Sequence, residues 1–295
     1  MDIYLVDGTY ELFRHFFVVP KSSDSKGQEI GATRAVLGSV LNMVERGARY
    51  VGVATDHVIE SFRNDLYPHY KTGEGIEEAL YSQFPILEES LQSMGVKVWP
   101  MVEFEADDAL AAAAVKAADL ADVDKVIICT PDKDLSQCVV GDRIVQLDRM
   151  RNTTRNEAGV IEKFGVSPKS IPDYLALVGD SADGYPGLPG WGAKASGTVL
   201  GLYGHLENIP KLAEQWNSSI RGAKKLAGTL HEQWDDAILF RKLATLRHDV
   251  PVFNSIEELR WRGPEASFEA TCERLKSKDL LKRCNALLDQ ISANV

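Results

Sequence analysis

The stretch "VEFEADDALAAAAVKAADL" at residues 102–120 places acidic side chains at the beginning of an alanine-rich helical pattern. Four carboxylates stand within six positions: Glu103, Glu105, Asp107 and Asp108. Acidic residues are favoured in a first helical turn because they face the positive end of the helix dipole. That effect accounts for two of the four. Glu105 and Asp108 are three residues apart and share one helical face, which suggests a common ligand.

The chain on both sides of this helix alternates apolar runs with helical patterns. Apolar residues at helical spacing predict helices over 31–48 and 77–95, and Pro85 must kink or split the second one. The apolar runs predict five strands: "DIYLVDG" (2–8), "YVGVATD" (50–56), "VKVWP" (96–100), "KVIICTPDKD" (125–134) and "DRIVQLD" (142–148). This alternation is typical of an α/β fold with a mainly parallel central sheet flanked by helices.

The second half of the chain has no strand pattern. Residues 167–204 predict a helix, a Gly/Pro-rich turn and a second helix, and residues 205–295 are mostly amphipathic and helical. We therefore expect an α/β domain over 1–160 and a helical region over 161–295.

Charge and cysteine content restrict the function classes. Lys plus Arg number 33 and Asp plus Glu 43, for a net charge of −10. Phosphate contacts come from Lys and Arg. If the chain binds a nucleic acid, its basic residues must therefore be concentrated in one region, and some of its acidic residues must be neutralised, most simply by bound cations. The cysteines lack a C-x-x-C spacing and indicate reduced thiols; they are Cys129, Cys138, Cys272 and Cys284. Without a basic leader or a long apolar run, we expect a cytoplasmic protein that does not contact a membrane.

Acidic residues also follow the predicted strands. Asp7 ends the first strand and Asp56 the second, while Asp132 and Asp134 follow the fourth. In open parallel sheets, the ligand site lies at the carboxyl ends of the strands, so these acids and the helix start at Glu105 should share one rim. Any one of them alone is more often a turn residue or a helix cap. Several such groups together would raise each other's pKa values, a cost that a divalent cation removes.

The type of ligand atom narrows the choice of metal ion. All the candidate ligands are oxygen atoms, which favours Mg²⁺ or Mn²⁺ over zinc. The surplus of carboxylates suggests two ions, and ions roughly 3.5–4 Å apart are the arrangement for phosphodiester hydrolysis. The sequence shows no Ser–His–Asp set, no phosphate-loop lysine and no G-x-G-x-x-G after a strand.

Three motifs resemble the 5′-nuclease family, which includes the 5′–3′ exonuclease domain of bacterial DNA polymerase I and the flap endonucleases. They are "FEADDALAAAA", "ICTPDKDLSQ" and "LVGDSADGYPGLPGWGAKAS", and the resemblance extends from Asp7 to about residue 210. It implies a standalone nuclease that cleaves branched DNA near a 5′ end, with roles in DNA replication and repair, and it assigns Asp7 and Asp132 to catalysis. It implies metal binding by nine acids: Asp7, Asp56, Glu105, Asp107, Asp108, Asp132, Asp134, Asp180 and Asp183. Glu103 falls outside the motif.

The resemblance also implies a DNA-binding helix–three-turn–helix over about 175–205. Its loop would approach a phosphate through Gly190 and Gly192, since glycine has no side chain, and the next helix would add its N–H groups and Lys194. The family also suggests a potassium ion held by main-chain carbonyls of this loop. Trp191 is expected to pack rather than to stack on a base.

A helical arch over about 68–95 is implied by "FRNDLYPHYKTGEG" at residues 62–75. Arg63, Tyr70 and Lys71 match the family, and the resemblance assigns Arg63 and Lys71 to catalysis. Lys71 would lie beside the scissile phosphate, and Tyr70 would stack on a terminal base. Arg14 matches a phosphate-contacting position. Glu74 departs from the family, which usually carries an arginine there, and this departure puts the phosphate grip in doubt.

These observations predict a monomeric, metal-dependent 5′ nuclease that cleaves 5′ flaps and 5′ ends of DNA; they do not identify replication or repair proteins as partners. One alternative is a structure-specific DNA-binding protein with weakened or lost cleavage, which Glu74 favours and nine intact acids disfavour. The other is an RNA-processing nuclease of the same sheet fold, which the arch and the helix–three-turn–helix disfavour.

Overall fold

The structure is a computed structural model that describes residues 1–218 and 220–293. The chain forms two compact units. The first holds Met1–Ile59, Gly73–Cys129 and the chain from His248 onward, and the second holds Glu60–Thr72 and Thr130–Arg247. Residue 160, where the sequence predicts a domain boundary, lies within the second unit. In the described residues, no helix is both long enough and apolar enough to span a membrane.

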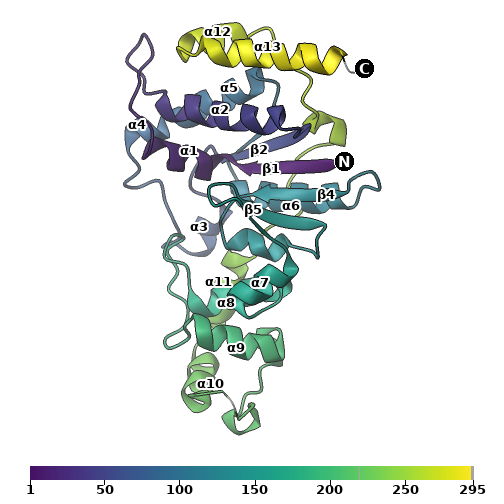
Figure 1. Ribbon diagram of the computed structural model, residues 1–295. Coiled ribbons are helices and arrows are strands. Elements are labelled where there is room, and N and C mark those ends of the chain that lie inside the picture. The colour runs from purple at the N-terminus through teal and green to yellow at the C-terminus, as the bar shows by residue number, and fades with distance from the viewer. Residues whose placement is uncertain (219, 294–295) are drawn as a thin grey trace. The chain divides into compact units, whose positions relative to one another are not determined.

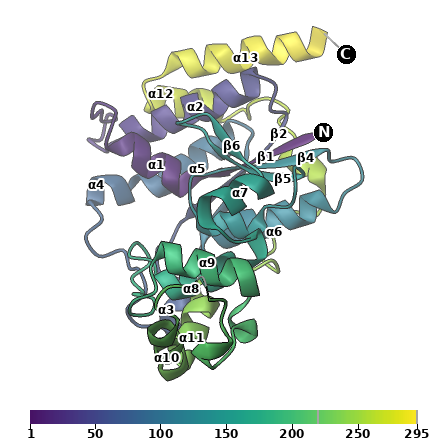
Figure 2. The same cartoon turned by 60° about the horizontal axis from the view of Figure 1, so that its bottom comes forward.

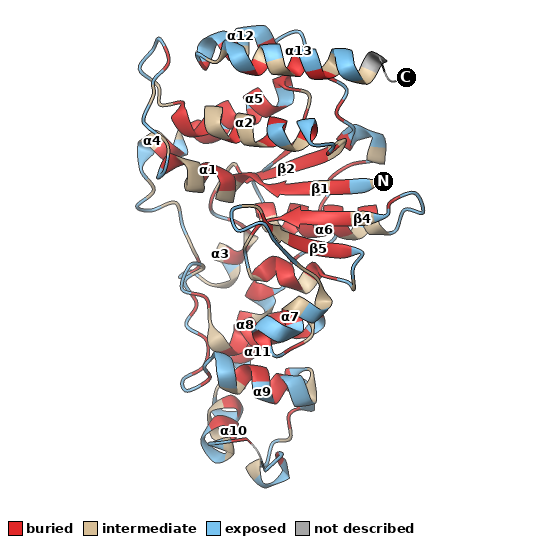
Figure 3. Ribbon diagram, in the orientation of Figure 1, coloured by how far each residue is buried: buried red, intermediate tan, exposed pale blue. Residues whose placement is uncertain are grey.

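The first unit is built on a parallel sheet. Its strands are β1 (Asp2–Asp7), β2 (Tyr50–Asp56), β3 (Lys97–Met101) and β4 (Lys125–Cys129). Strand β1 lies in parallel between β2 and β4, and β2 pairs with β3. Apolar runs that are buried on both faces form such strands, and the predicted parallel sheet is confirmed. Figure 3 shows that most of β1, β2 and β4 is buried.

Helices cover the sheet of the first unit. Helices α1 and α5 contact β2, α5 also contacts β3, and α6 contacts all four strands. Figure 1 shows α12 and α13 lying over α2 and α5. These elements are α1 (Gly8–Phe16), α2 (Gly31–Glu45), α4 (Glu78–Tyr81), α5 (Gln83–Ser93), α6 (Ala106–Ala118), η5 (Ile256–Leu259), α12 (Phe268–Arg274) and α13 (Lys278–Ala293).

The alanine-rich body of α6 is explained by its burial. Ala109, Ala111, Ala113, Ala114 and Ala117 are each fully buried. Alanine has the highest helix propensity, and its single methyl group lets the helix lie close to the strands that it contacts.

Proline positions set two element ends. Helix α4 ends at Tyr81 and α5 begins at Gln83, so the predicted split occurs and Pro85 falls in the first turn of α5, where its missing N–H needs no partner. Strand β4 was predicted to run to residue 134 but ends at Cys129, two residues before Pro131. Proline cannot donate to a strand ladder, and the acids that follow it therefore lie outside the strand.

The second unit is mainly helical. Strands β5 (Ile144–Asp148) and β6 (Thr153–Arg155) form an antiparallel hairpin, of which β6 was not predicted. Helix α8 packs against α9 and α11, and Figure 2 shows α8, α9, α10 and α11 grouped together. The helical elements are α3 (Phe62–Leu66), η1 (Asp134–Cys138), α7 (Glu157–Phe164), η2 (Pro168–Ser170), α8 (Ile171–Val178), α9 (Ala193–Tyr203), η3 (Leu206–Asn208), η4 (Ala213–Gln215), α10 (Ala223–Glu232) and α11 (Trp234–Ala244).

A tight turn joins α8 to the loop before α9. Gly187 has a φ of +68°, and a Cβ built on it would lie 2.3 Å from the Gly179 nitrogen. Both the left-handed backbone and the close approach require glycine here.

Gly187→Ala should therefore lower the free energy of unfolding by about 1–3 kcal/mol or more, measured by urea titration. Gly228, inside α10 with nothing within 4 Å of a built Cβ, is the matched control. Gly228→Ala should raise stability by about 0.5–1 kcal/mol because alanine is the better helix former. Equal effects of the two changes would contradict this account of the turn.

Candidate metal centre

The first unit carries acidic side chains at the carboxyl ends of its strands, and the parallel pairing brings these ends to the same edge of the sheet. Asp7 and Asp56 are the last residues of the neighbouring strands β1 and β2, and Glu105 is the N-cap residue of α6, which follows β3. Asp7, Asp56, Glu105 and Asp108 are buried, and Asp107 is half-buried. Glu103 is exposed.

Three of these carboxylates also hold helix N-termini. Asp7 accepts a hydrogen bond from the Tyr10 N–H (2.8 Å), and Asp56 Oδ1 accepts one from the Ala106 N–H (2.7 Å). Asp108 Oδ2 accepts one from the Glu105 N–H (3.0 Å). A carboxylate has about four acceptor positions, so a capping bond leaves capacity for a cation. Capping and metal binding are therefore compatible roles for the same side chains.

In the second unit, three carboxylates lie close together. Asp134 begins η1, and Asp180 and Asp183 lie in the loop after α8. One oxygen from each of the three lies within 4.8 Å of those of the other two. The loop is closed by paired main-chain hydrogen bonds between Asp180 and Tyr185, of 2.8 and 3.1 Å. This grouping brings together acids that are far apart in the sequence.

The charges of this cluster are only partly balanced by the protein. The ammonium group of Lys133 lies 2.6 Å from Asp180. Burial, followed by the charges of Asp132, Asp183 and Asp180, raises the pKa of the Asp134 carboxyl well above its usual range. Asp134 Oδ1 is buried and has no hydrogen-bond partner among the described residues. A cation would supply the missing interaction, so the three oxygen ligands fit a hard divalent metal ion.

Two further sequence candidates lie around this cluster. Asp132 is exposed, and its Oδ1 accepts a hydrogen bond from the Asp134 N–H (2.9 Å), which fixes the turn that presents Asp134. Lys71 donates its main-chain N–H to the Asp183 carbonyl (2.9 Å), and its Nζ lies 3.7 Å from Asp183 Oδ1. Lys71 therefore approaches a carboxylate of the three-carboxylate group, whereas Asp132 contacts the main chain of Asp134.

The remaining candidates of the arch segment are engaged elsewhere. Arg63 is buried and donates to the main-chain carbonyls of Leu243 (2.7 Å) and Thr245 (3.1 Å), which fastens α3 to the end of α11. Tyr70 is 3% exposed and belongs to the hydrophobic core of the second unit. Stacking on a base would require its ring to leave that core. In the first unit, Arg14 lies 2.6 Å from the buried Glu11.

The predicted helix–three-turn–helix region contains α8, a glycine-rich loop and α9. Gly190 has a φ of +85°, Gly192 is the N-cap residue of α9, and Lys194 is exposed in its first turn. A groove beside α9 is lined by Lys163 and Lys194. Trp191 is buried, with its ring 6.1 Å from that of Trp216, so its predicted packing role is confirmed.

Sequence reasoning missed two residues of the cluster, Lys133 and Tyr185. Lys133 stands between two acids in "PDKD", a spacing that could have indicated a charge partner. Tyr185 follows the acidic pair of "GDSADGY", and nothing in the sequence shows that its hydroxyl is buried.

Comparison with known proteins gives matches over most of the chain. The family model described as the 5′–3′ exonuclease N-terminal resolvase-like domain matches residues 2–165, and the one described as the 5′–3′ exonuclease C-terminal SAM fold matches residues 166–267. A 5′–3′ exonuclease of Aquifex aeolicus is 32% identical over 293 residues, covering 98% of this chain and 97% of that protein. DNA polymerase I of Pseudomonas aeruginosa is 34% identical over 87% of this chain, which spans 28% of the polymerase.

Solved structures share the fold. T5 5′-exonuclease with bound zinc superposes with a TM-score of 0.66 at 18% identity, covering 98% of this chain and 99% of that one. The catalytic core of Rad2 in complex with DNA substrate superposes with a TM-score of 0.63 at 15% identity, covering 96% and 91% of the two chains.

The raised pKa of Asp134 predicts a pH-dependent loss of stability when metal is absent. A folded-state pKa above the usual 3.8 means that the stabilising, protonated form is lost as pH rises from about 4 through the folded-state pKa. In a chelator, Asp134→Asn should therefore gain stability relative to the wild type across this range. Urea unfolding from pH 4 to 8 measures the difference, with exposed Glu162→Gln controlling for the loss of one charge. A difference that does not change with pH would show that Asp134 is not strained by its neighbours.

Proposed function

The chain belongs to the 5′–3′ exonuclease family of phosphodiester hydrolases, and on this premise we propose that it cleaves 5′ flaps and 5′ ends of DNA by metal-dependent hydrolysis. The resemblance of the three sequence motifs to this family is thus confirmed. The observation that carries the proposal is the cluster of Asp134, Asp180 and Asp183 with Lys71 beside it.

We propose Mg²⁺ or Mn²⁺ as the cation, with two ions bound in the active enzyme. Asp134, Asp180 and Asp183 would hold one, with Asp132 presenting Asp134 through its bond to the main chain. The buried acids of the first unit, which keep acceptor capacity beyond their capping bonds, are the proposed ligands of the other. Bound divalent cations would supply an activated water and stabilise the leaving oxygen.

The protein's own part in the reaction is to bind and orient the phosphate. Lys71 lies next to Asp183, so a phosphate bound to a cation there would meet a positive side chain. An ammonium group fixed at this position would stabilise negative charge that grows on the phosphate oxygens. We include Asp7 and Asp132 among the residues required for catalysis, and we propose that Arg63 acts by holding the segment that carries Lys71.

DNA binding by so acidic a chain requires concentrated positive groups. We propose that the free N–H groups at the start of α9, with Gly190, Gly192 and Lys194, hold a backbone phosphate, and that Lys163 extends this surface. Contacts of this kind position the duplex without reading its sequence. The proposal has three further parts. The loop carbonyls hold a potassium ion, and Arg14 contacts a phosphate. Tyr70 leaves the hydrophobic core to stack on a terminal base.

The exposed Glu74 favours one alternative, a DNA-binding protein that cleaves poorly, because a negative charge in the arch repels phosphate. An RNA flap offered beside the DNA flap tests the other alternative, an RNA-processing nuclease. The cleavage assay below tests the first alternative, and preferential cleavage of the RNA flap would favour the second.

Cleavage of a labelled 5′-flap duplex should require both a divalent metal and the carboxylate cluster. Asp134→Asn should reduce the cleavage rate by orders of magnitude in Mg²⁺ or Mn²⁺ because the ion loses a charged ligand. The variant should still bind the flap in Ca²⁺. Glu162→Gln, which removes an exposed charge of the same unit, should cleave at the wild-type rate. If the wild-type protein binds the flap but does not cleave it in Mg²⁺ or Mn²⁺, the DNA-binding-protein alternative is favoured instead.

Lys71→Ala should lower the single-turnover cleavage rate by about 10²–10³-fold and weaken DNA binding much less, because its interaction strengthens in the transition state. Lys71→Arg, which keeps the charge, should restore part of the rate. Lys169→Ala, an exposed lysine of the same unit, is the control for lost charge. Equal losses of rate and binding in Lys71→Ala would reduce Lys71 to an anchoring residue.

A further inference from the structure

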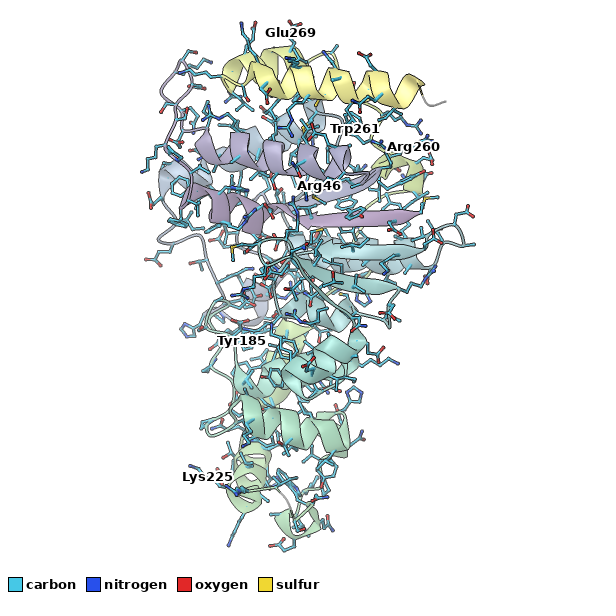
Figure 4. The ribbon with its side chains drawn as sticks, in the orientation of Figure 1. Arg46, Tyr185, Lys225, Arg260, Trp261 and Glu269 are labelled. Atoms are coloured by element: carbon cyan, nitrogen blue, oxygen red, sulfur yellow. The ribbon has the colours of Figure 1, made fainter. Side chains whose placement is uncertain are left out.

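One hydroxyl group is buried near the carboxylate cluster without a hydrogen-bond partner in the described part of the chain. It belongs to Tyr185, which is 1% exposed and follows Asp183 by two residues. Figure 4 labels this side chain in the second unit. Asp134 Oδ1, in the cluster itself, is a second buried atom without a partner. Buried polar atoms are nearly always hydrogen-bonded, and the described residues hold six without a partner. Two of the six belong to a cluster ligand, Asp134, and to Tyr185, whose main chain is bonded to the ligand Asp180, which points to a missing bound species at the cluster.

The position of the Tyr185 side chain is fixed by the fold. Its main chain exchanges two hydrogen bonds with Asp180, which ties it to a cluster ligand. Its ring stacks on Phe240, with centroids 5.6 Å apart and planes at 25°. The hydroxyl therefore cannot turn to solvent without breaking the packing of the core, and its surroundings are set by the loop that carries Asp180 and Asp183.

The surroundings of the hydroxyl are negative. Burial, followed by the charges of Asp134, Asp183 and Asp180, raises the pKa of Tyr185, and Arg63 opposes this shift. A tyrosine hydroxyl can both donate and accept a hydrogen bond.

We propose that the Tyr185 hydroxyl binds a water molecule in the hydration shell of the divalent cation held by Asp134, Asp180 and Asp183, and so positions that cation. Mg²⁺ in proteins usually keeps several waters, and these need partners beyond the carboxylates. A partner in this outer shell orients the ion and adds to its affinity. Tyr185 is thus a positioning residue, and the inference deepens the proposed function because it concerns the same cluster.

The direct test is Mn²⁺ binding to the full chain without DNA, followed by electron paramagnetic resonance. The binding site that is lost in Asp134→Asn identifies the ion held by the cluster. Tyr185→Phe keeps the stacked ring and removes the hydroxyl, and it should weaken Mn²⁺ at that site by about 10-fold or more. Tyr174→Phe is the matched control, because Tyr174 lies in the same core, edge-on to Phe164, and also loses only a hydroxyl. It should bind Mn²⁺ as the wild type does.

Thermal unfolding gives a second readout that a purely structural tyrosine would not produce. In a chelator, Tyr185→Phe should be as stable as the wild type or more stable, because it removes a buried hydroxyl that has no hydrogen-bond partner among residues 1–218 and 220–293. Saturating Mn²⁺ should raise the unfolding midpoint of the wild type more than that of Tyr185→Phe. A clear loss of stability in the chelator would show that the hydroxyl bonds to the protein, and would overturn the proposal.

The two proposals can fail separately. Wild-type Mn²⁺ affinity in Tyr185→Phe would overturn the role of Tyr185 even if the chain cleaves flaps. Conversely, a chain that binds Mn²⁺ in a Tyr185-dependent way but cleaves no DNA would contradict the proposed function and support the role of Tyr185.

Discussion

Like-charge repulsion between buried carboxylates is the constraint on which the rest of the structure depends. In the first unit, Asp7, Asp56 and Asp108 are each satisfied by a main-chain N–H at the start of a helix. In the second unit, Asp180 is paired with Lys133, but one oxygen of Asp134 has no hydrogen-bond partner within the described part of the chain. The helix starts and the loop after α8 are thus arranged around negative charge, and the chain neutralises the second set incompletely. An incompletely neutralised set of oxygen ligands is what a cation-binding site requires.

Much of the fold could be predicted because buried segments are rich in apolar residues, which can be recognised in the sequence. Strands covered on both faces are continuous apolar runs, and all five predicted strands occur. Strand β6 escaped prediction because Thr153 and Thr154 are exposed and only three residues pair, so there is neither an apolar run nor an alternation. The end of β4 was placed too late because the acids after Pro131 were counted with the strand, although the proline had already ended it.

The acids of the site could be predicted, but their surroundings could not. "PDKD" and "GDSAD" are recognisable motifs, and the packing of η1 against α8 brings their carboxylates together. Arg63 was expected to be a catalytic residue, yet its hydrogen bonds go to carbonyls about 180 positions away in the sequence. Tyr185 was overlooked because the burial of its hydroxyl depends on stacking against Phe240. Side-chain roles that depend on such distant partners leave no local pattern in the sequence.

The division of the chain into interleaved segments has a consequence for how the protein is made. Strands β1 to β4 are complete once residue 129 has been synthesised, but their unit also needs the segment that begins at His248. That segment supplies the Val252 carbonyl that accepts from Trp99 Nε1, and Trp261, whose Nε1 donates to the Met94 carbonyl (2.8 Å). At about 5–20 residues per second, a ribosome takes roughly 6–24 s to add residues 130–247. The nascent sheet therefore lacks part of its covering layer until the segment that begins at His248 has been translated.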